Sequence, residues 1–191
     1  MKSIGLLGGS FDPPHRGHLY ISLEAKKILN LNEIWWLVTP QNPLKIAKPA
    51  TYNERIKNCR NITRGLPIKI SEIEKKINST YSYQSLNYIL NNYKNIKFFW
   101  LMGSDNLINF HKWQKWQNIF NEISIVIFKR HGYNSLALKS ITSKKFTTSK
   151  IRSLILNKKN FKKLPSWTWV NNKEIKISSS EIRKQRNLLR G

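Results

Sequence analysis

The chain has 191 residues, of which 40% are apolar, so it is long enough to bury a hydrophobic core and suited to a single domain over residues 1–191. Its apolar runs are far shorter than the roughly 20 residues of a membrane-spanning helix, and glycines interrupt the apolar start before a signal-peptide core could form. The single cysteine, Cys59, excludes an internal disulfide framework, and its helical context predicts a buried thiol. We therefore expect a cytoplasmic protein without a membrane segment.

The net charge of +24 has two competing explanations. A basic chain is typical of nucleic-acid-binding domains, which use positive charge to hold phosphates. Here, however, lysines outnumber arginines and are spread over nearly the whole sequence, and asparagine and isoleucine are also abundant. Codon bias in an AT-rich genome produces that pattern, so compositional bias is favoured over a nucleic-acid function. A positive field would also attract anionic small molecules.

Apolar runs and segments with helical spacing alternate along the first 129 residues. In chain order they predict a strand at 2–7, a helix at 17–29, a strand at 33–40, a helix at 51–64, a strand at 66–70, a helix at 82–93, and strands at 96–102 and 122–129. Thr51 and Glu54 form the capping-box pattern that opens the second helix. Nearly continuous apolar strands separated by helices predict an α/β fold: a doubly wound, Rossmann-like parallel sheet with helices on both faces.

The last third of the chain is harder to interpret. Residues 134–173 are rich in lysine and serine, and we expect a helical stretch at 147–157. Residues 174–178 then predict a last short strand. Ser178 and Glu181 form a second capping box, which opens a C-terminal helix over 179–189.

The loop after the first strand contains unusually many conformationally special residues. Gly8 and Gly9 allow the backbone to approach a ligand closely, and two prolines at 13–14 stiffen the loop. His15 and His18 are three residues apart at a predicted helix start, next to unpaired N–H groups and the positive end of the helix dipole. In doubly wound sheets, ligands bind at this edge of the sheet. The loop therefore predicts a phosphate-binding site.

Three roles for the two histidines compete. As metal ligands they lack a third protein ligand nearby, which makes them a poor match to known sites. As capping or core residues they would leave the neighbouring glycines and prolines unexplained. As hydrogen-bond donors to phosphate they fit their surroundings, because negative charge grows on phosphate during phosphoryl or nucleotidyl transfer.

The stretch GGSFDPPHRGH, residues 8–18, resembles the signature of the nucleotidyltransferase superfamily that carries an H-x-G-H motif after its first strand. Within that superfamily it is most similar to the bacterial nicotinate-nucleotide adenylyltransferases. Six further segments resemble motifs of the same family in the same order: PQNPLK (40–45), TYS (80–82), GSD (103–105), FHKW (110–113), KRHGY (129–133) and ISSSEIR (177–183). The resemblance thus covers the chain from residue 4 to residue 183.

The resemblance implies adenylyl transfer from ATP to nicotinate mononucleotide, which yields deamido-NAD and pyrophosphate in NAD biosynthesis. It implies catalytic roles for His15, His18 and Lys45. It implies ATP binding by Gly8, Gly9, Ser10, Phe11, Gly17, Gly103, Asp105, Ile177, Ser178, Ser179, Ser180 and Arg183, and binding of nicotinate mononucleotide by Lys45, Thr80, Tyr81, Trp113 and Arg130. Mg²⁺ is expected to arrive with ATP rather than on a dedicated protein site, with Asp12 as a candidate contact, direct or through water.

Some of these positions also have structural explanations. Trp113 has the spacing of a core aromatic residue, Asp105 could cap the following helix, and Arg55 is expected to make an ion pair or support the lysine loop rather than to catalyse. The chain departs from the family pattern at Leu44, where many members have histidine, and at Lys129 and His131, which replace arginine and proline.

Two other functions remain open at this point. A related enzyme of the superfamily could use nicotinamide mononucleotide, phosphopantetheine or a cytidine nucleotide. A basic nucleic-acid-binding domain would instead show steeply salt-dependent binding and no turnover.

Overall fold

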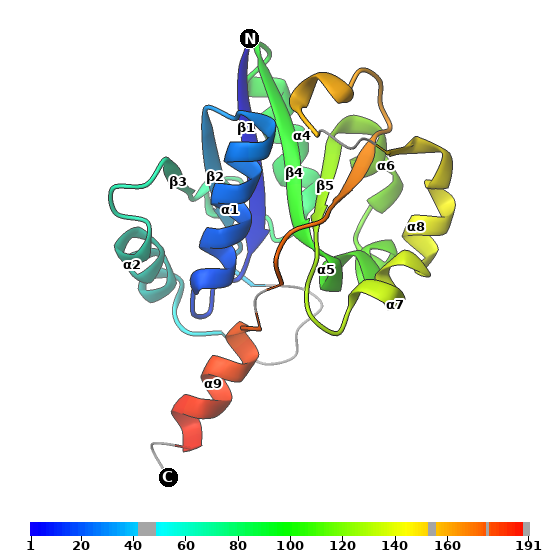
Figure 1. The fold of residues 1–191 in the computed structure, drawn as a ribbon. Helices are drawn as coiled ribbons and strands as arrows, with labels where there is room; N and C mark the ends of the chain where they lie inside the picture. Colours follow the sequence, from blue (N-terminus) through cyan, green and yellow to red (C-terminus); the bar gives the residue numbers. More distant parts are fainter. Residues whose placement is uncertain (42–48, 153–155, 175, 189–191) are drawn as a thin grey trace.

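A computed structural model describes residues 1–41, 49–152, 156–174 and 176–188, and it shows an α/β fold (Figure 1). Within these described residues, seven strands form one sheet in the order β3-β2-β1-β4-β5-β7-β6, and every neighbouring pair is parallel. The strands are β1 (Lys2–Gly9), β2 (Glu33–Val38), β3 (Ile68–Ser71), β4 (Ile96–Gly103), β5 (Ser124–Phe128), β6 (Lys150–Ile151) and β7 (Trp167–Val170). The predicted doubly wound parallel sheet is confirmed.

Helices connect the strands and cover both faces of the sheet. The α-helices are α1 (Arg16–Leu29), α2 (Tyr52–Ile62), α3 (Ile73–Lys76), α4 (Ser82–Asn92), α5 (Ser104–Asn109), α6 (Trp116–Glu122), α7 (Asn134–Leu138), α8 (Ile141–Lys145) and α9 (Ser179–Leu188). Short 3₁₀ turns occur at η1 (Phe110–Lys112), η2 (Thr147–Ser149) and η3 (Lys158–Asn160). None of the helices described here is long and apolar enough to cross a membrane.

The core consists of two apolar clusters, one on each face of the sheet. Successive residues of a strand point to opposite faces, so Trp35 belongs to the cluster under α4 and α6, whereas Trp36 belongs to the cluster under α1 and α2. Both indoles are almost completely buried. Cys59 lies in the second cluster, fully buried as expected, and burial raises the pKa of its thiol to about 12. It is an inert core residue.

The N-cap hydrogen bond of each predicted capping box is present among the described residues, whereas the reciprocal bond from the glutamate side chain to the N-cap N–H is not. The hydroxyl of Thr51 accepts a hydrogen bond from the backbone N–H of Glu54 at 3.3 Å, at the start of α2. The hydroxyl of Ser178 accepts from the N–H of Glu181 at 3.2 Å and also donates to the Glu181 carboxylate. Both helices therefore begin where the sequence indicates.

Two expectations for the last third of the chain are wrong. The predicted helix at 147–157 is replaced by η2 and the edge strand β6, and residues 153–155 lie outside the described part. The last strand is 167–170 rather than 174–178, because the segment WTWV occupies the position beside β5, where Ile125 pairs with Trp167. The described residues between β7 and α9 form no strand, and residue 175 is not described.

The strand order places a crevice at the carboxyl end of β1. From β1 the chain proceeds through α1 to β2 on one side, whereas β4, on the other side of β1, comes later in the sequence. This reversal of direction opens the sheet edge to a ligand. In Figure 1 the helix α9 lies beyond this carboxyl edge, near the start of α1. Residues from both ends of the chain therefore meet there.

Candidate active site

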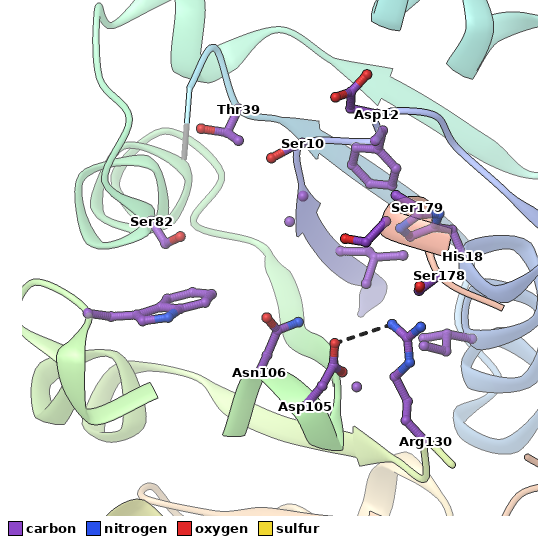
Figure 2. Close-up of a pocket in the computed structure, with 18 of the residues that line it drawn as sticks. Ser10, Asp12, His18, Thr39, Ser82, Asp105, Asn106, Arg130, Ser178 and Ser179 are labelled. Atoms are coloured by element: carbon purple, nitrogen blue, oxygen red, sulfur yellow. Dashed lines mark hydrogen bonds and ion pairs between the residues drawn. The ribbon is translucent and has the colours of Figure 1, made fainter. Parts of the chain in front are cut away.

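A pocket of about 600 Å³ occupies the crevice at the carboxyl edge of the sheet. Its lining includes most of the predicted site residues: Gly8, Gly9, Ser10, Phe11, Asp12, His15, His18, Thr80, Tyr81, Gly103, Asp105, Trp113, Arg130, Ser178, Ser179, Ser180 and Arg183. Figure 2 shows Thr39 and Ser82 on one side of the pocket and His18, Ser178 and Ser179 on the other. The pocket thus has two ends built from different segments of the chain.

Among the described residues, two predicted site residues do not line this pocket. Gly17 lies behind His15, where a Cβ would come within 2.9 Å of the imidazole ring. Ile177 contributes its backbone carbonyl to a hydrogen bond from Arg130 at 2.6 Å. Both therefore support the lining from behind. Lys45 lies outside the described residues, so its predicted role stays a prediction.

The structure adds lining residues that the sequence analysis missed. They are Leu7, Ile21, Thr39, Glu74, Ser82, Asn106, Lys112, Gln114 and Tyr133. Several are immediate neighbours of residues that were singled out, such as Asn106 beside Asp105, so motif adjacency could have indicated them. Glu74 lies outside every motif, and only the folded chain brings it to the pocket.

His15 and His18 form a reciprocal cap at the start of α1. His15 is the N-cap residue, and its Nδ1 accepts a hydrogen bond from the backbone N–H of Gly17 at 3.1 Å. The backbone N–H of His15 in turn donates to Nδ1 of His18 at 3.2 Å. The two ring centroids lie 3.8 Å apart. The structural and phosphate-donor roles of these histidines are therefore compatible.

The reciprocal cap also fixes which nitrogen carries the proton in each ring. Nδ1 of both His15 and His18 accepts a hydrogen bond, so in the neutral ring the proton resides on Nε2. The pKa of His15 is lowered from 6.5 to about 4, mainly by burial and then by the charge of Arg130, while the charge of Glu181 opposes the shift. His15 is consequently a neutral Nε2–H donor at neutral pH.

Phe11 shapes the loop between β1 and the two histidines. Its backbone has φ 48°, a left-handed conformation that costs a side-chain-bearing residue about 1–2 kcal/mol. Its ring is 1% exposed and stacks on Trp36 with 4.5 Å between centroids, and it also contacts the ring of His18. Packing of the side chain therefore holds the backbone of this loop in a conformation that it would not adopt alone.

Asp105 and Arg130 form an ion pair on the floor of the pocket (Figure 2), with Nη1 and Oδ2 3.3 Å apart. Asp105 follows β4 on α5, and Arg130 follows β5. A Cβ at Gly103 would lie 2.6 Å from Cδ of Arg130 and closer still to the Asp105 carboxylate. The glycine is thus required for close approach. The other oxygen of Asp105, Oδ1, is buried and has no partner among the described residues.

The start of α9 contacts the loop between β1 and α1, which carries the predicted phosphate-binding residues. The hydroxyl of Ser179 donates to the backbone carbonyl of Pro13 at 3.0 Å. Arg183 donates to the backbone carbonyl of Asp12 and forms an ion pair with its carboxylate, with Nη1 and Oδ2 3.5 Å apart. The N-termini of α1 and α9 therefore open into the same pocket, and both can direct N–H groups at an anion.

Asp12 is poorly placed to serve as a dedicated metal ligand. One carboxylate oxygen accepts a hydrogen bond from the N–H of Ala50 at 3.4 Å, and the other faces Arg183. The described residues contain no group of three or more acidic, histidine or cysteine side chains that could hold a metal ion. The carboxylate of Asp12 could thus reach a divalent cation only while its oxygens are already engaged by Ala50 and Arg183.

The other end of the pocket is built by the segment before α4 and by Trp113. The backbone N–H of Tyr81 donates to the hydroxyl of Ser79 at 3.1 Å, which orders the segment that carries Thr80 and Tyr81. Trp113 packs against Phe110, with ring centroids 4.7 Å apart, and is only partly buried. The core explanation and the ligand explanation for Trp113 therefore both apply, because the indole belongs to the core cluster and also faces the pocket.

Glu74 is a buried carboxyl group in the pocket wall. Its side chain is 2% exposed, and Oε2 has no hydrogen-bond partner among the described residues. Burial raises the pKa of Glu74 from 4.5 to about 7, although hydrogen bonds from Thr39 and Ser85 oppose the shift. A substantial fraction of Glu74 is therefore protonated at neutral pH.

The doubly wound sheet and the pocket at its carboxyl edge define an α/β protein that binds its ligand at the switch point of a parallel sheet. The family model described as cytidylyltransferase-like matches residues 6–185. Curated relatives from Ruegeria sp. (strain TM1040) and Pelagibacter ubique (strain HTCC1062), each named probable nicotinate-nucleotide adenylyltransferase, are 40% and 41% identical to this chain. The alignments cover 96% and 95% of this chain and 97% and 92% of the relatives. The chain belongs to the cytidylyltransferase-like family and, within it, to the nicotinate-nucleotide adenylyltransferases.

A solved structure supports the same fold. Nicotinic acid mononucleotide adenylyltransferase of Plasmodium falciparum, complexed with NaAD, superimposes with a TM-score of 0.71 at 21% sequence identity. The match covers 96% of this chain and 83% of that one.

Proposed function

We propose that the chain transfers the adenylyl group of ATP to nicotinate mononucleotide, which yields deamido-NAD and pyrophosphate. The observation that carries the proposal is the pocket with two ends, in which two helix N-termini face a wall containing Trp113 and the Thr80–Tyr81 segment. The helix N-termini suit a polyphosphate, and the opposite wall suits an aromatic ring that bears a carboxylate.

The reaction is an in-line attack by the phosphate of the mononucleotide on the α-phosphorus of ATP. A new phosphorus–oxygen bond forms as the bond to pyrophosphate breaks, and no covalent enzyme intermediate is needed. The protein must align two anions and stabilise the charge that develops between them. We assign this task to Nε2–H of His15 and of His18 as hydrogen-bond donors, with the ammonium group of Lys45 adding positive charge.

The nucleotide occupies the end of the pocket that contains α9. Backbone groups of the Gly9–Phe11 loop and the N–H groups at Ser178–Ser180 bind the triphosphate, and Arg183 adds positive charge. Asp105 holds the nucleoside end, where its Oδ1 remains available to a ligand hydroxyl while Oδ2 pairs with Arg130. Gly8 and Gly103 keep the lining free of side chains at two close approaches.

Mg²⁺ enters as part of the MgATP substrate in this proposal. Phosphate oxygens and water are its natural ligands, and a magnesium ion bound this way needs few protein groups. The engaged carboxylate of Asp12 agrees with a water-mediated contact better than with a direct one.

The test is pyrophosphate release from ATP with nicotinate mononucleotide, nicotinamide mononucleotide and phosphopantetheine as separate acceptors. We expect the highest kcat/KM with nicotinate mononucleotide and a product with the mass of deamido-NAD. A preference for either other acceptor would assign the chain to a sibling activity. Salt-dependent DNA or RNA binding without turnover on any acceptor would overturn the enzyme assignment.

A further inference from the structure

Arg55, on α2, is a buried cation whose hydrogen bonds to the described residues all go to backbone carbonyl groups, and its guanidinium also lies 5.4 Å from the ring centroid of Tyr52. Arg55 is 1% exposed. No carboxylate of the described residues lies within ion-pair distance of its guanidinium. Nε donates to the carbonyl of Ala50 at 3.0 Å, Nη1 donates to those of Ser10 at 2.6 Å and Thr39 at 2.8 Å, and Nη2 donates to that of Pro40 at 2.7 Å. The expected ion pair is absent from the described residues, and the supporting role remains.

These four carbonyl groups come from three separate segments of the pocket region. Ser10 belongs to the loop between β1 and α1, which carries the phosphate-binding residues. Thr39 and Pro40 follow β2, and Ala50 precedes α2, so Pro40 and Ala50 flank the segment 42–48. Only a guanidinium offers several donors in a rigid planar fork that can reach all of these groups at once. Arg55 therefore sets the relative position of the three segments.

The hydrogen bond to Ser10 acts on the loop beside the phosphate site. The peptide group between Ser10 and Phe11 is trans, so its N–H points away from the guanidinium that holds its carbonyl. Phe11 is also the residue with the left-handed backbone conformation. Arg55 thus helps to hold a disfavoured loop conformation and orients the Phe11 N–H, one of the backbone donors that we assign to ATP.

The peptide groups of Ala50 are held from two directions. Its carbonyl accepts from Arg55, and its N–H donates to the carboxylate of Asp12. Asp12 also pairs with Arg183, which extends from α9. An unbroken series of polar contacts therefore runs from the phosphate-facing helix α9 to the segment that follows β2.

Stability alone does not account for a cation at this position. Burial lowers the pKa of Arg55 below its usual value, which reflects the cost of removing the charged group from water. Apolar side chains that fill a buried ionic site well are often as stabilising as the charged group or more so. A role in fixing the geometry of the substrate-binding segments explains why the fold buries a charged guanidinium despite the cost of removing it from water.

We propose that Arg55 is a positioning residue for adenylyl transfer, because it fixes the Ser10 loop and both flanks of segment 42–48 in one arrangement. This inference rests on the proposed function for its kinetic readout. The guanidinium touches neither substrate. It acts through the carbonyl groups of Ser10, Thr39, Pro40 and Ala50.

The test compares Arg55→Lys with Arg60→Lys, a matched control on the same helix whose guanidinium is exposed and pairs with Glu72. A lysine ammonium cannot reach four carbonyls from one point, so we expect Arg55→Lys to lower kcat by about 10- to 100-fold. The KM for both substrates should rise, and Arg60→Lys should match the wild type. An Arg55→Lys enzyme with a lower Tm but a kcat and KM near wild-type values would reduce Arg55 to a structural residue and overturn the proposal.

A second variant covers the case in which lysine disrupts folding. In Arg55→Ala, added methylguanidinium should restore part of the lost kcat, and it should leave Arg60→Ala unchanged. A folded Arg55→Ala enzyme with normal kinetics would contradict the proposal, as would an Arg55→Ala enzyme whose Tm rises with methylguanidinium while kcat does not recover.

Equilibrium binding of ATP separates this proposal from the proposed function. Wild-type turnover with nicotinate mononucleotide tests the function alone. ATP binding needs no acceptor, so a Kd for ATP that rises about tenfold in Arg55→Lys supports the positioning role even if the acceptor proves to be another mononucleotide. If Arg55→Lys leaves the Kd for ATP, the kcat and the KM values all unchanged, the positioning role of Arg55 is refuted.

Discussion

The backbone N–H of His15 donates to Nδ1 of His18, while Nδ1 of His15 accepts from the N–H of Gly17. Each imidazole therefore uses one nitrogen to cap α1 and keeps the proton on the other. The same two hydrogen bonds that start the helix thus orient both rings and set their tautomers. Capping thus uses Nδ1 of each ring, and the phosphate binding that we propose uses Nε2–H.

This division of labour can be tested at His18 with two amide substitutions. The Oδ1 of asparagine can replace Nδ1 as the cap acceptor, whereas glutamine places its amide near Nε2. We expect His18→Asn to keep its Tm near that of the wild type and to lose about 100-fold or more in kcat. His18→Gln should retain more of kcat and lose more stability. Equal kcat for wild type and His18→Asn would contradict the assigned donor role.

The pKa of His15 predicts how stability responds to acid. Its folded-state pKa of about 4 lies below the unfolded value of 6.5, so the unfolded chain takes up a proton first as the pH falls. The free energy of unfolding should decrease from pH 6.5 down to about 4, by about 3 kcal/mol at most from this group. Above pH 6.5 the contribution is constant. Urea unfolding of wild type and His15→Asn at both ends of this range measures the difference, and equal pH dependence in the two proteins would refute the prediction.

Glu74 should show the opposite pH dependence. Its folded-state pKa of about 7 lies above the unfolded value of 4.5, so its contribution is fully present below pH 4.5 and is lost as the pH rises through 7. Glutamine resembles the protonated carboxyl, so Glu74→Gln should unfold at higher urea than the wild type when the pH exceeds 7. Ser85→Ala, which removes one hydrogen-bond partner of Glu74, serves as a control that leaves the carboxyl in place. A Glu74→Gln protein that is less stable than the wild type above pH 7 would contradict this prediction, because it would show that the ionised carboxylate of Glu74 is stabilised by its surroundings in the folded protein.

Trp113 is expected to act mainly on the acceptor. Trp113→Ala removes an indole that faces the pocket, so the KM for nicotinate mononucleotide should rise about tenfold while the KM for ATP changes little. Trp113→Phe keeps an aromatic face against Phe110 and should retain most of the affinity. Initial-rate measurements with each substrate varied separately give both constants. A rise in the KM for ATP alone would move Trp113 to the nucleotide end of the pocket.

The sheet could be predicted from the sequence because its strands are buried on both sides. Continuous apolar runs such as 33–38 leave few alternatives to a central parallel strand, and the predicted elements through β5 lie within about two residues of their observed bounds. The short helices α3, α5 and α6 were not predicted. The wrong predictions of a helix at 147–157 and a strand at 174–178 have a physical cause. The helices α7 and α8 have five residues each, too few for a helical period to stand out. The alternation of aromatic and β-branched residues in WTWV was the stronger strand signal there.

The candidate site was predictable only where short motifs mark it. The H-x-G-H segment was found because its residue types are chemically unusual. Gly103 with Asp105 and the start of α9 were singled out through the family resemblance. The four carbonyl groups around Arg55 carry no side-chain signal, since any residue supplies the same carbonyl. The pocket position of Glu74 likewise depends on which segments the fold brings together.

The hydrogen bond between Ser179 and the carbonyl of Pro13 joins residues 166 positions apart. During synthesis the loop between β1 and α1 emerges early, together with α1. The residues of α9, which complete the proposed polyphosphate site, emerge last among the described elements. The earlier part of the sheet can fold while this half of the site is still missing. Nucleotide binding is therefore gained late, and a chain that stops short of α9 could retain much of the sheet without the ability to grip ATP.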